Sequence, residues 1–298
     1  MNKLDVVWRE FRLWDARAVR ADTRLKRARR GALFCALAGA ACGALAGQLG
    51  LSEATPEASA LPERLGMLSA LLVGLAAWIG RELLDPESER RRTGARALAE
   101  SIKREVHLVL MQVPPYDSDL ASERLEEAVS RVRMKVGVAD RAYTTTLPEG
   151  DESLPQVGTV EEYVTNRVED QIDWHERKVA LYAVQLDRWR RGRLALSLLA
   201  MVLALGASEA AAFPLWVPVV TTFGGLVAAH MGALRLSSMI PSYEQTAFRL
   251  RYVLADWKDG KIASPVELVR RSESILADEN ATWLAAWPST EDGGAAGA

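Results

Sequence analysis

Few residues of this chain are of types and spacings that could carry out a reaction together. The three histidines, His107, His175 and His230, are too far apart in the sequence to form a metal-binding pair on one helix. There is no glycine-rich phosphate loop and no nucleophile elbow. No pair of carboxylates stands in a recognisable catalytic context, so most hydrolytic schemes lack a general base. We therefore expect no enzymatic activity, no cofactor and no bound metal.

One acidic residue, Glu209, lies inside a long apolar segment. A carboxylate at the centre of a bilayer costs about 2.5–3.5 kcal/mol on insertion scales and usually has a function there. Helix rise places Glu209 near the far end of a span that begins after Arg193. The favoured interpretation is a turn residue that touches water. The alternative is an acidic ring at a pore mouth, which would select cations.

A group of basic residues could hold a phosphate-bearing ligand. It consists of Arg90, Arg91, Arg92, Arg96 and Lys103. Basic runs of this kind are more often solvated surfaces or topology signals. Anion binding is therefore the less favoured interpretation of these residues.

The longest apolar segment, 194–234, is interrupted only by Glu209 and His230. A membrane-spanning helix needs about 20 apolar residues, so this segment is long enough for two. Gly206 and Pro214 lie near its middle, where a tight reversal is expected. A buried hairpin in a soluble protein is the alternative, but few soluble cores carry so little charge over such a length.

A second apolar pair lies in the first half, at 31–51 and 65–84. The charged region before residue 31 is too long for a signal peptide. The sequence thus predicts four spans, at about 31–51, 65–84, 194–211 and 215–234. The flanks 24–30, 81–96 and 188–193 are basic, whereas the loops at 51–63 and 207–214 contain no Lys or Arg. Because positive flanks stay in the cytoplasm, both termini are expected there.

Small residues recur every four positions in the first span: Gly31, Cys35, Gly39, Gly43 and Gly47. This spacing puts them on one stripe, where another backbone can approach closely. The partner is either the next helix of this chain or another subunit, as in a homo-oligomer. The two cysteines, Cys35 and Cys42, both lie in this segment and indicate no disulfide framework.

Each hairpin is flanked by charged amphipathic segments, so the order of parts repeats approximately. Residues 1–30 carry an aromatic face and many arginines, a pattern typical of membrane-surface or nucleic-acid binding. We instead expect a cytoplasmic packing helix that leads into the span, with no nucleic acid bound. The sequence predicts an all-α integral membrane protein of two parallel repeats, each a hairpin with long cytoplasmic helices. The expected modules are 1–140 and 159–288, with a linker at 141–158 and a disordered tail at 289–298.

The segment before the second hairpin carries a specific motif. Tyr163, Arg167, Gln171, Trp174 and Lys178 give the order Y-x3-R-x3-Q-x2-W-x3-K, and Glu279 and Trp283 give E-x3-W in the last helix. Arg96, Glu100 and Lys103 follow the first hairpin in a related order. Together they resemble the SLATT family, the SMODS- and SLOG-associating two-transmembrane effector domains of bacteria, in a tandem two-module form. His175 stands where the family pattern has Tyr.

The resemblance implies an effector of bacterial conflict or antiphage defence systems in the inner membrane. Such an effector is expected to form or gate an oligomeric pore on a nucleotide-linked signal. The signal would come from a nucleotidyltransferase or a nucleotide-sensing partner protein. The motif residues are then expected to clamp the Tyr163–Lys178 segment to the Glu279–Trp283 helix. The alternative is a non-conducting four-span scaffold that anchors a cytoplasmic partner.

Overall fold

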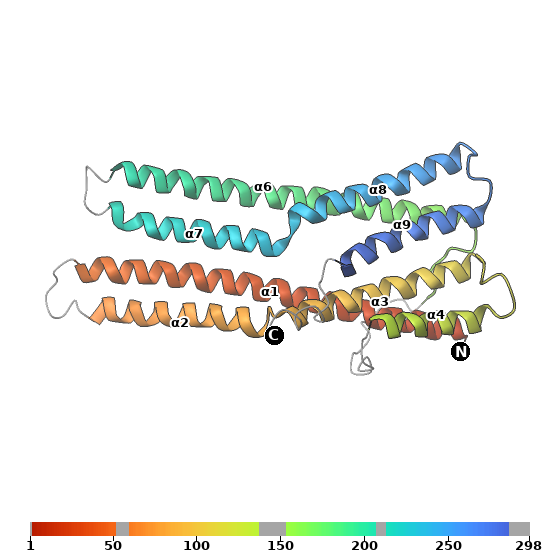
Figure 1. The fold of residues 1–298 in the computed structure, drawn as a ribbon, viewed down its shortest axis with the longest axis horizontal. Helices are drawn as coiled ribbons and strands as arrows, with labels where there is room; N and C mark the ends of the chain where they lie inside the picture. The colour runs from red at the N-terminus through yellow and green to blue at the C-terminus, as the bar shows by residue number, and fades with distance from the viewer. Residues whose placement is uncertain (1, 52–59, 137–152, 207–212, 286–298) are drawn as a thin grey trace, which may run out of the picture. The chain divides into compact units, whose positions relative to one another are not determined.

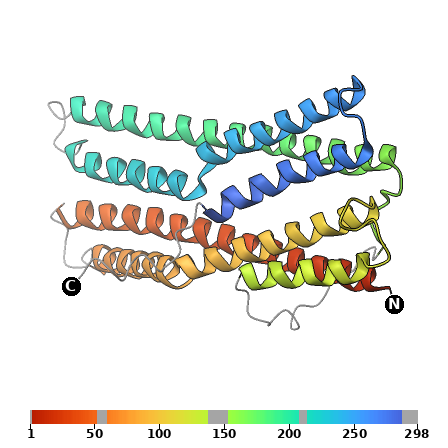
Figure 2. The ribbon, with the colours of Figure 1, turned by 45° about the vertical axis from the view of Figure 1, so that its right-hand side comes forward.

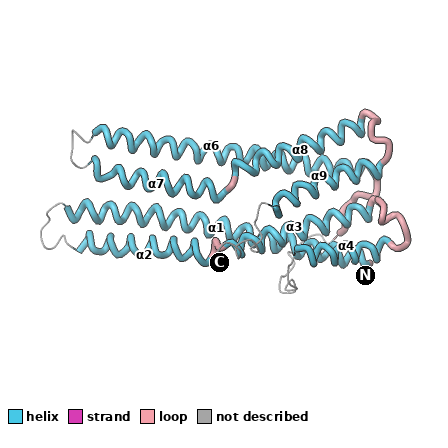
Figure 3. Tube along the Cα trace, viewed as in Figure 1, coloured by secondary structure: helices cyan, strands magenta, loops and turns pink. Residues whose placement is uncertain are grey.

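A computed structural model describes residues 2–51, 60–136, 153–206 and 213–285. All regular structure in these residues is helical, and they contain no strand (Figure 3). The prediction of an all-α chain is confirmed. The helices follow in the order α1 (Lys3–Leu51), α2 (Ala60–Glu82), α3 (Pro86–Leu110), α4 (Ala121–Val136), α5 (Val160–Tyr163), the π-helix η3 (Val164–Glu169), α6 (Asp170–Leu205), α7 (Phe213–Leu234), α8 (Leu236–Lys258) and α9 (Pro265–Ala285).

Two helix starts follow directly from local sequence. Thr159 accepts a hydrogen bond from the Glu162 amide at 3.2 Å, and the Glu162 carboxylate accepts one from the Thr159 amide at 3.1 Å. This reciprocal capping box satisfies amides that the first helical turn leaves unpaired. Ser264 caps α9 in a similar way, accepting from the Glu267 amide at 3.2 Å. Pro265 is the first residue of that helix, where a missing N–H does no harm.

The chain forms two compact units, each assembled from both halves of the sequence (Figure 1). Unit 1 comprises Met1–Thr23, Pro86–Val179 and Pro241–Ala298, and unit 2 comprises Arg24–Asp85 and Ala180–Ile240. This division separates charged from apolar segments, and it differs from the two sequential modules expected from the sequence. The repeat of two modules stays a prediction.

Distant segments contribute to one hydrophobic core among the described residues of unit 1. Fully or nearly fully buried members include Leu98 and Ile102 of α3, Leu125 of α4, Leu250 of α8 and Leu268 of α9. The Asn280 amide also donates to the Ala97 carbonyl at 3.1 Å, which ties α9 to α3. First-half and second-half helices therefore bury their apolar faces against one another in one bundle.

Unit 2 leaves many large apolar side chains exposed. No described residue of α2 is buried, and Leu71 there is 66% exposed. Three helical stretches are long and apolar enough to cross a membrane, Lys3–Gly50, Ala60–Glu82 and Trp216–Lys258. They cover most of three of the four predicted spans, while the fourth, 194–211, runs into residues 207–212, which are outside the described residues. This surface is typical of helices that face lipid.

The small-residue stripe of α1 packs against α2, and the two helices lie side by side in both ribbon views (Figures 1 and 2). A Cβ at Gly39 would lie 2.8 Å from Val73 Cγ2 and 3.2 Å from the Val73 amide nitrogen. The Ser69 hydroxyl donates to the Gly39 carbonyl at 2.8 Å, an approach that the absence of a Cβ permits. At Gly47, by contrast, a Cβ would have no heavy atom of the described residues within 4 Å outside its own helical turn.

This packing predicts that leucine at Gly39 destabilises the hairpin. The added side chain would force α1 from the α2 backbone, and overpacking of this kind typically costs about 1–3 kcal/mol. Thermal unfolding of the full chain in detergent micelles would show a lowered Tm for Gly39→Leu. The matched control is Gly47→Leu, which adds the same apolar volume where there is space. Equal Tm values for both variants would rule out the described α1–α2 contact.

Candidate functional site

The motif segment begins at the capping box and passes through a π-helical turn. Tyr163 ends α5, and Arg167 lies within η3, four positions later. Both side chains point into unit 1, where Tyr163 is 0% and Arg167 2% exposed. Short π-helical segments recur at functional sites, because they reorient side chains relative to the flanking α-helix. Here the π-turn carries the motif arginine into the core.

Both motif residues bind one buried carboxylate, Glu273 of α9. Arg167 donates from Nε to Oε1 at 2.9 Å and from Nη2 to Oε2 at 3.0 Å, a bidentate pair. The Tyr163 hydroxyl donates to the same Oε1 at 3.1 Å. The side chains of Arg167 and Glu273 are only 3% and 1% exposed. This network connects the motif segment to α9 in the centre of unit 1.

Burial and pairing act in opposite directions on the Glu273 carboxylate. Burial alone would raise its pKa, since desolvation disfavours the charged form. The charge of Arg167 and its hydrogen bonds outweigh burial and hold the pKa of Glu273 below its usual value. Burial followed by the Glu273 charge raises the pKa of Tyr163 well above its ordinary value. The network is thus a charged pair with a neutral phenol donor.

Two residues of α3 adjoin the network. His107 is 2% exposed, its Nδ1 lies 2.7 Å from the Lys103 carbonyl, and its ring meets Tyr163 edge-on at 6.5 Å between centroids. Burial, followed by the charge of Arg167, lowers the pKa of His107 to about 3. The pKa of Lys103 is also lowered, first by burial and then by Arg167. The neighbourhood of Arg167 therefore disfavours further positive charge.

The next turn of α6 carries a second, aromatic contact group. His175 Nε2 lies 2.7 Å from Glu279 Oε2, and its Nδ1 lies 2.6 Å from the Gln171 carbonyl. A protonated ring donates to both acceptors, whereas a neutral ring donates to one. Trp174 and His175 both pack on Tyr243 of α8, at 5.5 and 5.4 Å between centroids. His175, the departure from the family pattern, is therefore the residue that meets the predicted Glu279.

The remaining predicted clamp residues surround Trp174. Lys178 Nζ lies 5.4 Å and the Arg96 guanidinium 5.7 Å from its ring centroid, both within cation–π range. Trp283 belongs to α9, but its side chain is outside the described residues. Trp174 therefore contacts Tyr243 of α8 and the guanidinium of Arg96 on α3. The expected role of Trp174 in docking its own helix on α9 stays a prediction.

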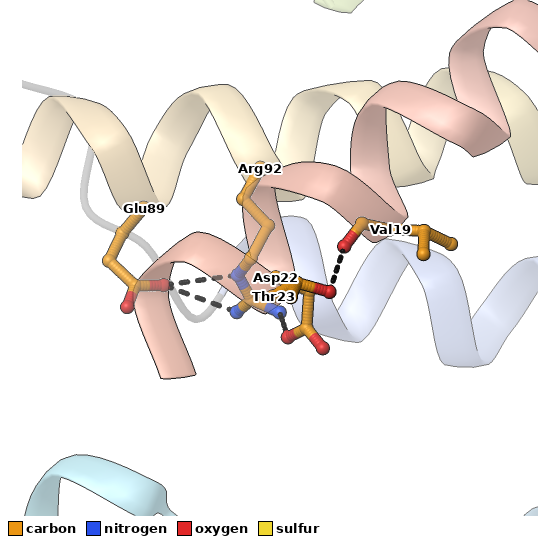
Figure 4. Close-up of polar contacts among 5 residues, drawn as sticks. All are labelled: Val19, Asp22, Thr23, Glu89 and Arg92. Carbon is orange, nitrogen blue, oxygen red and sulfur yellow. Dashed lines mark hydrogen bonds and ion pairs between the residues drawn. The ribbon is translucent and has the colours of Figure 1, made fainter. Parts of the chain in front are cut away.

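The cations proposed for an anionic ligand are spread along α3. Arg92 binds Asp22 of α1 at 3.3 Å and Glu89 at 3.2 Å, as Figure 4 shows. Arg91 pairs with Glu87 at 3.3 Å on the surface, and Lys103 Nζ lies 5.8 Å from the Phe11 ring centroid. The structure thus places these cations on separate partners within unit 1. Glu209, the possible pore-mouth residue, lies outside the described residues.

Sequence reasoning missed the central acid, Glu273. Helical spacing gives a signal, because Glu273 is four residues after Val269 and three before Leu276, on the flank of an apolar stripe. A carboxylate there needs a buried cation, and Arg167 is the motif residue that supplies it. The described residues contain no group of three or more His, Cys, Asp or Glu side chains placed to hold a metal. The geometry is suited to fixing helix positions.

The buried neutral His107 predicts a loss of stability in acid. The folded protein holds its pKa at about 3, below the ordinary 6.5, so the unfolded chain takes up the proton first as pH falls. The stability that neutral His107 contributes to the fold is fully present above about pH 6.5 and is lost as the pH falls from 6.5 to 3. His107→Phe keeps an aromatic ring without the titrating group.

The measurement is Tm of the full chain in micelles across this pH range. Other groups also respond to acid, so the difference between wild type and His107→Phe is the relevant quantity. The wild type should lose more stability than the variant as pH falls from 7 to 4. Parallel pH profiles would contradict the assigned burial of a neutral His107.

Comparison with known families identifies the segment that carries this site. Residues 163–283 match the family model of the SMODS and SLOG-associating 2TM effector domain 1. The match runs from Tyr163 through the α6–α7 hairpin to Trp283 of α9. Searches of curated proteins and of solved structures give no match. The segment 163–283, which carries the buried network, is thus similar to domains of the SLATT family.

Proposed function

We propose that this chain is a pore-forming or pore-gating effector, acting as an oligomer in the bacterial inner membrane in response to a nucleotide-linked signal. The observation that carries the proposal is the match of residues 163–283 to a two-transmembrane effector domain, a type found in conflict and defence systems. The apolar exposed helices of unit 2 support a membrane location. The basic flanks support an orientation with both termini in the cytoplasm.

Unit 2 leaves surface for further copies of the chain. On α6, Leu198, Val202 and Leu205 are 49%, 60% and 73% exposed. At Gly47 the stripe of α1 is not covered by any described residue, so a helix from another copy can approach there as closely as α2 approaches Gly39. These exposed surfaces support the assembly of several copies of the chain around a common pore.

A signal must reach the membrane segments through helices that serve both units. Residues of α1 and of α6 belong partly to unit 1 and partly to unit 2. A ligand or partner shifts such a system only by binding one arrangement of unit 1 better than the other. The family description names association with SMODS and SLOG domains. We therefore assign the signal to a separately encoded partner of the nucleotidyltransferase or nucleotide-sensing kind.

One observation favours the alternative, a non-conducting scaffold. Three hydroxyls of α6 and α7 bind backbone carbonyls of their own helix: Ser197 to Arg193, Thr221 to Val217 and Thr222 to Pro218, at 3.1, 2.9 and 2.7 Å. These groups are satisfied without water. A conducting state would then need Glu209, or a rearrangement that exposes the hydroxyls.

Dye release from vesicles distinguishes the two functions. The purified full chain, reconstituted into vesicles loaded with a small fluorescent dye, should release it if an oligomer conducts. Trp174→Ala removes the packing on Tyr243 and should change the release rate without preventing insertion. Arg177→Gln, an exposed position on the same helix, is the control. Absence of release from all three inserted proteins would support the scaffold and exclude a pore opened through this contact.

A further inference from the structure

Six of the exposed arginines of unit 2 flank its apolar segments in two groups. We call them the collar arginines; they are Arg24, Arg27 and Arg30 of α1 and Arg188, Arg190 and Arg193 of α6. Among the described residues, none of the six guanidinium groups has a carboxylate or hydrogen-bond partner. The stretch from Arg24 to Arg30 contains no acidic residue. Asp187, the acid nearest the α6 group in sequence, already pairs with Arg191.

Several exposed arginines of unit 1 do have carboxylate partners. Arg91 pairs with Glu87, Arg249 with Asp278 at 2.9 Å, and Arg251 with Glu176, although these arginines are 65%, 42% and 62% exposed. Exposure alone therefore does not leave an arginine of this protein unpaired. The collar concentrates positive charge that unit 2 does not neutralise.

The collar has the depth of a lipid headgroup layer. Helix rise of 1.5 Å per residue gives about 9 Å from Arg24 to Arg30 and about 8 Å from Arg188 to Arg193. The headgroup region on each side of the hydrocarbon is about 5–8 Å thick. Trp189 and His230 of α7 lie 5.1 Å apart between ring centroids, and the charges of Arg29 and Arg30 act on His230. The collar segments of α1 and α6 thus both lie close to His230 of α7.

The surface beside the collar is apolar. Leu194 directly follows Arg193 and is 60% exposed, and Phe34 of α1, one turn after Arg30, is 69% exposed. A ligand that covers both the collar arginines and this apolar surface must be anionic at one end and apolar along its length. Phospholipids with an anionic headgroup have this chemistry, whereas free phosphate and nucleic acid have only the charge.

We propose that the collar arginines bind anionic phospholipid headgroups and that unit 2 prefers a leaflet containing them. The proposal rests on the membrane placement in the proposed function, but not on conduction. Each Lys or Arg near an anionic surface adds attraction. The headgroup supplies the acceptors that the protein itself lacks, and the acyl chains cover the exposed leucines.

Native mass spectrometry of the full chain in a neutral detergent tests this directly. Titration with phosphatidylglycerol and with phosphatidylcholine should give tighter binding of the anionic lipid by the wild type. The triple variant Arg188→Gln, Arg190→Gln, Arg193→Gln should lose about a hundredfold of that preference. A second triple variant, Arg24→Gln, Arg27→Gln, Arg30→Gln, should lose a similar share of the preference for phosphatidylglycerol over phosphatidylcholine.

The control removes the same charge elsewhere: Arg131→Gln, Arg177→Gln and Arg270→Gln, all exposed in unit 1, should keep the full preference. Raised salt should weaken anionic-lipid binding by the wild type and the control. Equal affinity of the wild type for the two lipids would overturn the proposal and leave the collar as an insertion signal. Displacement of phosphatidylglycerol by a short DNA duplex or by inorganic phosphate would also overturn it. Because the readout is lipid binding, a failed pore assay leaves this result unaffected.

Discussion

The buried pair of Arg167 and Glu273 is the constraint on which unit 1 depends. Each charge is almost completely removed from water, and each is tolerable only because the other is present. Arg167 donates to both carboxylate oxygens, and Tyr163 adds a third hydrogen bond, to Oε1. The Nη1 of Arg167 has no hydrogen-bond partner among the described residues, so even this geometry leaves part of the desolvation cost uncompensated. A pair of this kind specifies one arrangement of helices more than it adds stability.

The network also explains why the two halves of the sequence share one bundle. Arg167 and Glu273 are separated by 106 positions, and Asn280 and Ala97 by 183, yet each pair is in contact. His107 of α3 packs on Tyr163, so a first-half helix closes over the second-half motif. The segment that matches the SLATT model therefore completes its core with helices from outside residues 163–283. The apolar helices of unit 2, in contrast, leave many of their side chains exposed.

Much of this was accessible from sequence because it depends on local patterns. Hydropathy and length predict the spans, the Thr159–Glu162 spacing predicts the capping box, and small residues predict the close approach at Gly39. Tyr163 and Arg167 were identified because the segment resembles the SLATT family motif. Glu273 was not found, because a charged residue is normally assigned to the surface and its buried partner is far along the chain. The π-turn at η3 and the division into two units likewise depend on contacts between distant segments, which spacing alone does not reveal.

A double-mutant cycle on Arg167 and Glu273 tests the central claim most directly. Arg167→Met or Glu273→Gln alone leaves the remaining partner with an uncompensated buried group, a change that typically costs about 3–5 kcal/mol. The double variant removes both charges, so thermal unfolding of the full chain should show much less destabilisation than the sum of the single changes. Additive losses would contradict the account, because they would mean that the two side chains do not depend on each other.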